Sequence, residues 1–184
     1  MYIAENWRDY QVLDAGDGEK LERWREFVLR RPDPQAIWPK QDEAMWAGAD
    51  AVYRRSARGG GEWEFHKKLP ERWVVRYGAL SFYVRPTGFK HTGLFPEQAV
   101  NWDWMAGLIG AAGRPVRVLN LFGYTGGATL ACCAAGAHVT HVDAAKGMVQ
   151  WARENRQLNQ LDERRTRWIV DDAAKFVARE ARRG

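Results

Sequence analysis

Hydrophobic and polar positions alternate in two different ways along this chain, and the change comes near residue 100. Before it, aromatic and β-branched residues form short runs separated by glycine- or proline-containing segments, as at residues 62–65, 73–77 and 80–84. Such runs are typical of antiparallel hairpins. After it, short apolar runs alternate with segments of helical periodicity. We therefore expect a small β-rich domain over residues 1–98 and an α/β domain over residues 99–184.

The second half predicts three strand-helix pairs. The expected strands are residues 116–121, 138–143 and 167–171, and the expected helices are residues 127–135, 146–158 and 173–181. This alternation implies a parallel sheet with right-handed crossovers. In the first half, Leu21, Trp24 and Val28 lie at helical spacing before Arg31-Pro32. That spacing predicts one short amphipathic helix over residues 18–28.

Composition is that of an ordinary globular protein, with 184 residues of which 46% are hydrophobic. No run approaches the roughly 20 apolar residues needed to span a bilayer. The N-terminal residues lack the basic and then apolar plan of a signal peptide. We therefore expect a cytoplasmic protein with no membrane partner.

The sequence predicts neither a metal site nor a reactive thiol. Cys132 and Cys133 are neighbours in an alanine-rich run, where small buried residues are the simpler interpretation and a nucleophile the less favoured one. The four histidines show no metal-ligand spacing, and His138 and His141 fall on opposite faces of one strand. We expect no metal.

A glycine-rich turn follows the first strand of the α/β half, in the sequence Asn120-Leu-Phe-Gly-Tyr-Thr-Gly-Gly-Ala128. Its glycines allow a tight turn and the close approach of a ligand. The second strand ends at Asp143, which can accept hydrogen bonds from both ribose hydroxyls of a nucleoside cofactor or can cap the next helix. We favour ribose binding, and capping is compatible with it.

The third strand ends at Asp171-Asp172-Ala173, where an adenine ring could be held. We assign the adenine amino group to Asp172, with Asp171 in reserve, and a ring nitrogen to the Ala173 amide; helix capping is the alternative. The spacing of Gly123, Gly126 and Gly127 does not fit the Gly-x-Gly-x-x-Gly of dinucleotide sites. S-adenosylmethionine, which has no phosphate, therefore fits better than NAD.

These motifs resemble those of class I S-adenosylmethionine-dependent methyltransferases. The glycine turn, the strand end Val142-Asp143 and the upstream segment Thr92-Gly-Leu-Phe-Pro-Glu-Gln98 together are most similar to the branch of large-subunit ribosomal RNA cytosine-5 methyltransferases. The similarity covers about residues 70–184. It implies a Rossmann-like fold, of which only the first three β-α units are present, and S-adenosylmethionine as cofactor.

The resemblance also implies that the segment before the first strand lines the methionine end of the cofactor pocket. With the residues argued above, the expected cofactor-binding set is Lys90, His91, Gly93, Phe95, Gln98, Asn120, Phe122, Gly123, Tyr124, Thr125, Gly126, Gly127, Asp143, Asp171, Asp172 and Ala173. Core packing is the alternative role for Phe95, and a surface helix start for Gln98.

The resemblance places the catalytic loop after a fourth strand, as Asp-Pro-Pro-Tyr/Phe or a variant, and no Asp-Pro-Pro or Asn-Pro-Pro occurs in residues 1–184. The catalytic residues are therefore unknown, and we expect the isolated chain to bind cofactor but to transfer no methyl group. In the usual strand order the first strand would then be an exposed edge, which predicts weak stability or self-association.

The basic segment 54–90 suggests the substrate. It holds 9 Lys and Arg against 3 Asp and Glu, interleaved with seven aromatic residues. Cations can neutralise phosphates and exposed rings can stack on bases, although rings in strands also form cores. With the resemblance, this favours RNA. A protein or small-molecule methyltransferase and a non-catalytic RNA-binding module remain the alternatives.

Overall fold

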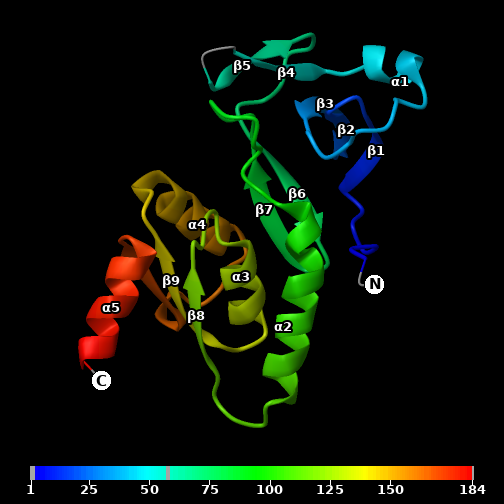
Figure 1. Cartoon of the computed structure of the whole chain (residues 1–184). Coiled ribbons are helices and arrows are strands. Elements are labelled where there is room, and N and C mark those ends of the chain that lie inside the picture. The colour runs from blue at the N-terminus through cyan, green and yellow to red at the C-terminus, as the bar shows by residue number, and fades with distance from the viewer. Residues whose placement is uncertain (1–2, 57–58, 184) are drawn as a thin grey trace. The chain divides into compact units, whose positions relative to one another are not determined.

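A computed structural model describes residues 3–56 and 59–183, which form two compact units (Figure 1). The N-terminal unit contains Asn6–Ala79 and Tyr83–Gly93. The C-terminal unit contains Leu80–Phe82 and the chain from Leu94 onward, together with the described residues before Asn6. No helix among the described residues is long and apolar enough to cross a membrane.

The N-terminal unit is built on a five-stranded sheet. The strands are β1 (Tyr10–Gly16), β2 (Glu19–Trp24), β3 (Phe27–Pro32), β4 (Ala51–Arg55) and β5 (Gly61–Phe65), in the order β1-β2-β3-β4-β5. Only β3 and β4 pair in parallel, and the short helix α1 (Glu43–Ala47) lies between them in sequence. β6 (Trp73–Tyr77) and β7 (Leu80–Val84) pair separately, and the division between the units falls within β7.

The helix predicted over residues 18–28 is wrong, because this segment forms the hairpin of β2 and β3. Trp24 pairs with Phe27 across a turn in which Arg25 has φ 61°. Leu21 and Trp24 are buried, as their spacing suggested, but so is Glu22 between them. Glu22 accepts hydrogen bonds from Nε and NH2 of Arg31 on β3 at 2.5 and 2.8 Å. Pairing with a neighbouring strand therefore overrides the helical spacing of the apolar residues.

The C-terminal unit confirms the predicted alternation of three strands and three helices. β8 (Arg117–Leu121), β9 (His138–Asp143) and β10 (Thr166–Val170) form a parallel sheet in the order β10-β9-β8. The helices that follow them are α3 (Gly127–Ala134), α4 (Lys146–Leu158) and α5 (Ala173–Arg183). The single-turn helices η1 (Pro96–Gln98) and η2 (Glu163–Arg165) precede α2 and β10.

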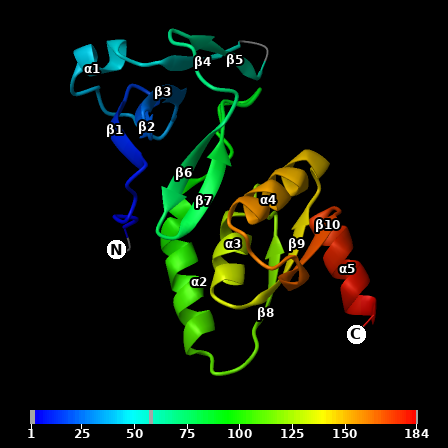
Figure 2. The same ribbon diagram turned by 180° about the vertical axis from the view of Figure 1, so that it is seen from behind.

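Helix α2 (Ala99–Ala111) is a further element that the sequence pattern did not predict, and it packs against α3. Cys132, Cys133 and Val139 form a core with side chains from α2 and β8. α5 lies on the other side of the sheet from α2 and α3, as both views show (Figures 1 and 2). Among the described strands β8 is at the edge of its sheet.

Candidate functional site

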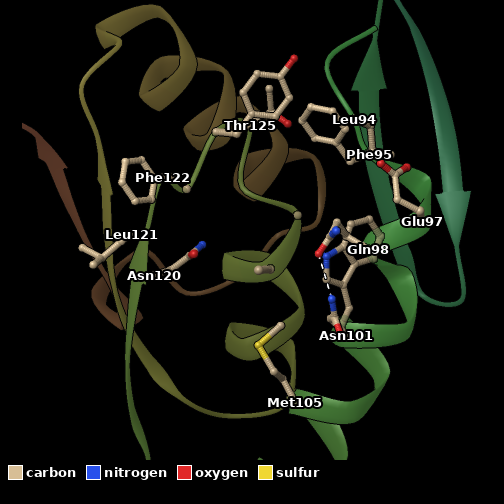
Figure 3. Close-up of a pocket in the computed structure, with 15 residues that line it drawn as sticks. Leu94, Phe95, Glu97, Gln98, Asn101, Met105, Asn120, Leu121, Phe122 and Thr125 are labelled. Atoms are coloured by element: carbon tan, nitrogen blue, oxygen red, sulfur yellow. Dashed lines mark hydrogen bonds between the residues drawn. The ribbon is translucent and has the colours of Figure 1, made fainter. Parts of the chain in front are cut away.

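A pocket of about 500 Å³ lies at the carboxyl end of β8, between the glycine turn and α2 (Figure 3). All the residues that line it belong to the C-terminal unit. They are Leu94, Phe95, Glu97, Gln98, Asn101, Trp102, Met105, Asn120, Leu121, Phe122, Gly123, Tyr124, Thr125, Gly127 and Ala128. Its size and its mix of apolar and amide side chains suit a small organic ligand.

The turn between β8 and α3 is held in an unusual backbone conformation. Phe122 and Tyr124 have φ of 55° and 50°, and Gly126 has φ 93°. Left-handed φ costs about 1 kcal/mol or more for a residue with a side chain, and such residues cluster at binding sites. Phe122 is 78% exposed despite its size, so its ring is available to a ligand rather than to the core.

Gly123 is required by the space beneath the turn. A Cβ at this position would lie 2.4 Å from Cε1 of His141 on β9. His141 is fully buried. Burial lowers its pKa to about 4, although the Asp143 carboxylate acts in the opposite direction. The turn therefore rests on a neutral imidazole.

That imidazole also belongs to a chain of hydrogen bonds that ends in the pocket. Asn120 donates from Nδ2 to Thr129 Oγ1 at 2.8 Å, and Thr129 Oγ1 lies 2.9 Å from Nδ1 of His141. The Thr129 hydroxyl oxygen has two lone pairs, so it can accept from Asn120 whichever way its hydrogen bond to His141 runs. Because Asn120 contacts Thr129 through its amide nitrogen, its carbonyl oxygen makes no hydrogen bond to Thr129. Asn120 then offers an acceptor to a cationic group in the pocket.

Asp143 joins the glycine turn to the end of β9. Its Oδ2 accepts from the Tyr124 amide at 2.9 Å, and its Oδ1 accepts from the Ala145 amide at 2.8 Å. A carboxylate has about four lone-pair positions, so two remain for further donors. Asp143 therefore holds the strained turn and can still accept the hydroxyl pair of a ribose.

Asp171 and Asp172 follow the next strand, and the Asp171 amide donates to the Asp143 carbonyl at 3.1 Å. Asp172 Oδ1 accepts from the Lys175 amide at 2.9 Å, which caps the start of α5. Asp171 Oδ2 accepts from Arg179 at 2.6 Å. The capping that the sequence offered as an alternative is thus present at Asp172, and Asp171 is held by an ion pair. The helix cap occupies only Oδ1 of Asp172, so Oδ2 is not used by it.

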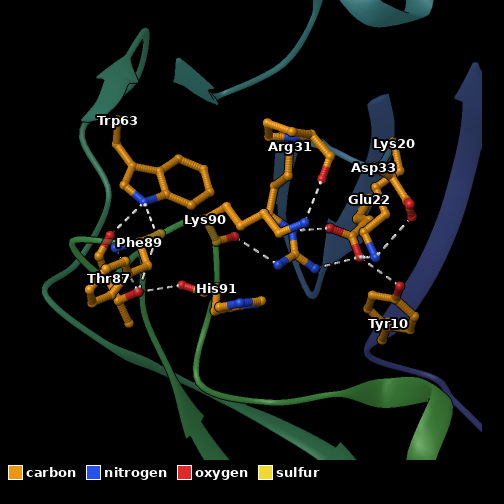
Figure 4. A network of polar contacts seen from close by, with 11 residues as sticks. Tyr10, Lys20, Glu22, Arg31, Asp33, Trp63, Thr87, Phe89, Lys90 and His91 are labelled. Carbon is orange, nitrogen blue, oxygen red and sulfur yellow. Dashed lines mark hydrogen bonds and ion pairs between the residues drawn. The ribbon is translucent and has the colours of Figure 1, made fainter. Parts of the chain in front are cut away.

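Lys90, His91 and Gly93 belong to the N-terminal unit. The Lys90 carbonyl accepts from Arg31 at 2.8 Å, and Lys90 Nζ lies 3.3 Å from the Pro32 carbonyl (Figure 4). Burial, and then the nearby Arg55, lower the pKa of Lys90. The His91 carbonyl accepts from the Thr87 hydroxyl at 2.8 Å. The segment before Leu94 is therefore anchored to the buried Glu22–Arg31 pair.

Sequence reasoning missed the contribution of α2 to the pocket. Asn101, Trp102 and Met105 line it, and Asn101 Nδ2 donates to Gln98 Oε1 at 2.9 Å (Figure 3). Pro96, followed by a run without proline, is the signal that could have placed a helix here. Trp102 also fixes the turn, since a Cβ on Gly127 would lie 2.6 Å from its ring.

The two cysteines lie away from this chemistry. Both are buried, as predicted. Burial, with the neighbouring Cys133, raises the pKa of Cys132 to about 11, and burial also raises the pKa of Cys133. A nucleophilic thiol needs an accessible thiolate, so these residues act as core side chains.

Comparison with known families shows to which family the chain belongs. A model of the S-adenosylmethionine-dependent methyltransferase family matches residues 42–182. The chain belongs to this family. The predicted resemblance, the Rossmann-like methyltransferase fold and the cofactor class are therefore confirmed.

Solved structures agree with the family assignment. A methyltransferase structure from Agrobacterium tumefaciens is 44% identical, with a TM-score of 0.91 over 97% of this chain and 57% of that one. A putative methyltransferase from Streptococcus mutans, at 19% identity and a TM-score of 0.75, shows the same fold.

Curated relatives are longer proteins. A ribosomal RNA large subunit methyltransferase K/L from Syntrophotalea carbinolica is 29% identical over 94% of this chain and 23% of its own length. The protein of that name from Shewanella oneidensis is 34% identical over 61% of this chain and 16% of its own length. The chain thus spans about a quarter or less of these two relatives.

Proposed function

We propose that this chain supplies the cofactor-binding part of an S-adenosylmethionine-dependent methyltransferase whose substrate is RNA, with ribosomal RNA as the leading class. The single observation that carries the cofactor assignment is the position of Asp143. Its carboxylate is fixed against the glycine turn by two backbone amides and retains two lone-pair positions. Those positions suit the two hydroxyls of a ribose.

The remaining contacts follow from the same geometry. The adenine ring would lie near Asp172 and the Ala173 amide. Asp171, which forms an ion pair with Arg179, is the alternative residue for the adenine amino group. The methionine end would lie along the glycine turn, with Asn120 accepting from its ammonium group. Phe95 and Gln98, which line the pocket, are also assigned to the methionine end. The assignment of Lys90, His91 and Gly93 stays a prediction from the sequence.

S-adenosylmethionine supplies, when bound, a methyl group on a sulfonium sulfur. The residues of this chain contribute orientation: Asp143 fixes the ribose, and the amides of the turn hold the methionine end. The hydrogen bond from Asn120 Nδ2 to Thr129 leaves the Asn120 carbonyl oxygen available to the cofactor.

RNA as substrate rests on charge and on the names of the relatives. The basic segment 54–90 keeps several cations in solvent, and Arg54 pairs with Glu64, which is about as exposed. Of its seven rings, Trp73, Tyr77 and Phe82 are buried, whereas Phe65 and Phe89 are 55% and 70% exposed. Positive charge is therefore the main feature that supports RNA, and the two exposed rings are available for stacking on bases. Action on ribosomal RNA would place the protein in the cytoplasm.

Calorimetric titration of S-adenosylmethionine and of NAD into the purified chain tests the cofactor assignment. We expect saturable binding of S-adenosylmethionine that weakens by at least about 100-fold in Asp143→Ala, because two charge-assisted hydrogen bonds are lost at about 1.5–3 kcal/mol each. Glu163→Ala, which removes an exposed carboxylate of the same unit, should bind like the parent chain. Binding of NAD alone would overturn the assignment.

RNA binding is tested separately by fluorescence anisotropy with a labelled ribosomal RNA hairpin at several salt concentrations. Salt-sensitive binding supports the proposed substrate class. Cofactor binding without any RNA retention would favour a protein or small-molecule substrate. RNA retention without cofactor binding would favour a non-catalytic RNA-binding module.

A further inference from the structure

A second hollow, of about 430 Å³, lies at the amino end of the parallel sheet in the C-terminal unit. It is lined by Pro115, Arg117, His138, Val139, Thr140, Arg164, Arg165 and Arg167. Four of these eight side chains are guanidinium groups, and no carboxylate is among the described residues that line it. The cofactor pocket, at the carboxyl end of β8, shares none of these residues.

The pairing of the strands explains why the cations gather here. Arg117 is the register partner of His138, so the two side chains project from the same face of the sheet. Arg167 on β10 is the partner of Thr140, which lies two residues after His138 and therefore on that face as well. η2 adds Arg164 and Arg165 immediately before β10.

The positive charge of this hollow is only partly balanced. Arg164 pairs with Asp162 at 3.1 Å, and Arg167 pairs with Glu180 at 3.4 Å. Arg165 donates to the Gly136 carbonyl at 2.6 Å, which orients the guanidinium without neutralising it. Arg117 has no ion-pair partner within the described part of the chain. Two uncompensated guanidinium charges therefore remain in one concavity, which favours an anion.

The spacing of the cations points to an extended anion. Arg117 and Arg167 stand on the two outer strands of the sheet, so their backbones are about 10 Å apart at about 4.8 Å for each strand spacing. A single phosphate could meet both guanidinium groups only if the two side chains converge, whereas successive phosphates of a nucleic acid backbone could meet each one separately. Arginine is also the residue best suited to phosphate oxygens, because its planar fork can donate two parallel hydrogen bonds.

We propose that this hollow binds the phosphate backbone of the RNA substrate at a distance from the methylated nucleotide. The inference rests on the proposed RNA substrate and adds a second contact to it. The six residues of β9 separate the two ends of the sheet by about 20 Å at about 3.3 Å per residue. An RNA that reaches both sites must therefore be longer or more folded than the few nucleotides around the target.

The test compares two double variants that remove equal charge. Arg117→Ala/Arg165→Ala removes the two uncompensated cations from the hollow, and Lys175→Ala/Arg182→Ala removes two exposed cations from α5 outside it. Anisotropy with a labelled RNA hairpin of about 30 nucleotides should show at least about tenfold weaker binding at 0.1 M salt for the first variant. The slope of log affinity against log salt should also fall by about two. The control should stay near the parent chain.

Further measurements distinguish a failure of this inference from a failure of the proposed RNA substrate. S-adenosylmethionine titration should be unchanged in both variants, which shows that they are folded. Equal RNA affinity of the two double variants, with the parent still binding RNA, overturns this inference and leaves the proposed function standing. No RNA binding by the parent chain overturns the proposed substrate itself. Saturable binding of inorganic pyrophosphate at the hollow, lost in Arg117→Ala/Arg165→Ala while RNA affinity is unchanged, would assign the hollow to a small anion.

Discussion

The buried histidine beneath the glycine turn should make this protein lose stability well above the pH at which its carboxylates titrate. Burial lowers the pKa of His141 from an ordinary 6.5 to about 4. Between these pH values His141 binds a proton in the unfolded chain but not in the folded chain, so the free energy of unfolding must fall as the pH falls. At pH 7 both states are neutral, and the effect is absent.

The magnitude follows from linkage. One pKa unit corresponds to about 1.4 kcal/mol, and titration from pH 7 to pH 5 should remove about 2 kcal/mol of stability. Burial alone would raise the pKa of Glu22, but Arg31 outweighs it and holds this pKa below the ordinary 4.5. Its contribution is therefore lost only at lower pH, outside this window.

Urea unfolding followed by far-ultraviolet circular dichroism is the suitable assay, because α2 to α5 belong to the C-terminal unit and α1 has only five residues. The comparison is between the parent chain, His141→Gln and His138→Gln, the last being an exposed histidine on the same strand. We expect the pH dependence to vanish in His141→Gln and to persist in His138→Gln. Identical slopes in the parent and His141→Gln between pH 7 and pH 5 would refute the reasoning.

Four other perturbations follow from the structure. Gly123→Ala should cost at least about 2 kcal/mol and abolish cofactor binding, whereas Gly147→Ala, where a Cβ meets nothing within 4 Å, should be neutral or stabilising in thermal melts. Arg31→Met should destabilise the N-terminal unit by about 3–5 kcal/mol in urea unfolding, because it leaves the buried Glu22 charge unpaired. Cys132 should resist Ellman's reagent in the folded chain and react only in urea, and a rapid reaction under native conditions would contradict its burial. Leu119→Lys, which charges the exposed face of the edge strand β8, should reduce any self-association seen by analytical ultracentrifugation, and an unchanged sedimentation profile would exclude that edge.

The α/β half was predictable because its signals are local and agree with one another. The strand over residues 138–143 and the helix over residues 146–158 have the same bounds in the structure as in the prediction. Glycine or aspartate lies at or just after the end of each strand, at Gly123, Asp143 and Asp171, so pattern and turn chemistry indicate the same element.

The N-terminal half was less predictable because its structure depends on pairing between strands. In β2 a charged residue, Glu22, is fully buried. No local sequence pattern indicates that its partner is Arg31, nine residues later. The apolar residues Leu21, Trp24 and Val28 have helical spacing although they belong to the two strands of a hairpin. The pocket residues on α2 were missed for a related reason: Asn101 and Met105 carry no motif and acquire a role only when α2 packs against α3.

Asp143 shows why binding and folding are difficult to separate at this site. The left-handed backbone at Phe122 and Tyr124 is costly, and the Asp143 carboxylate offsets part of that cost through the Tyr124 amide. The same carboxylate is the proposed ribose acceptor. Asp143→Asn retains an oxygen for one amide and loses the negative charge, so it should preserve the turn better than Asp143→Ala while still weakening the cofactor. A cofactor affinity that fell equally in both variants, with stability lost only in Asp143→Ala, would show that the charge itself serves the ligand rather than the turn.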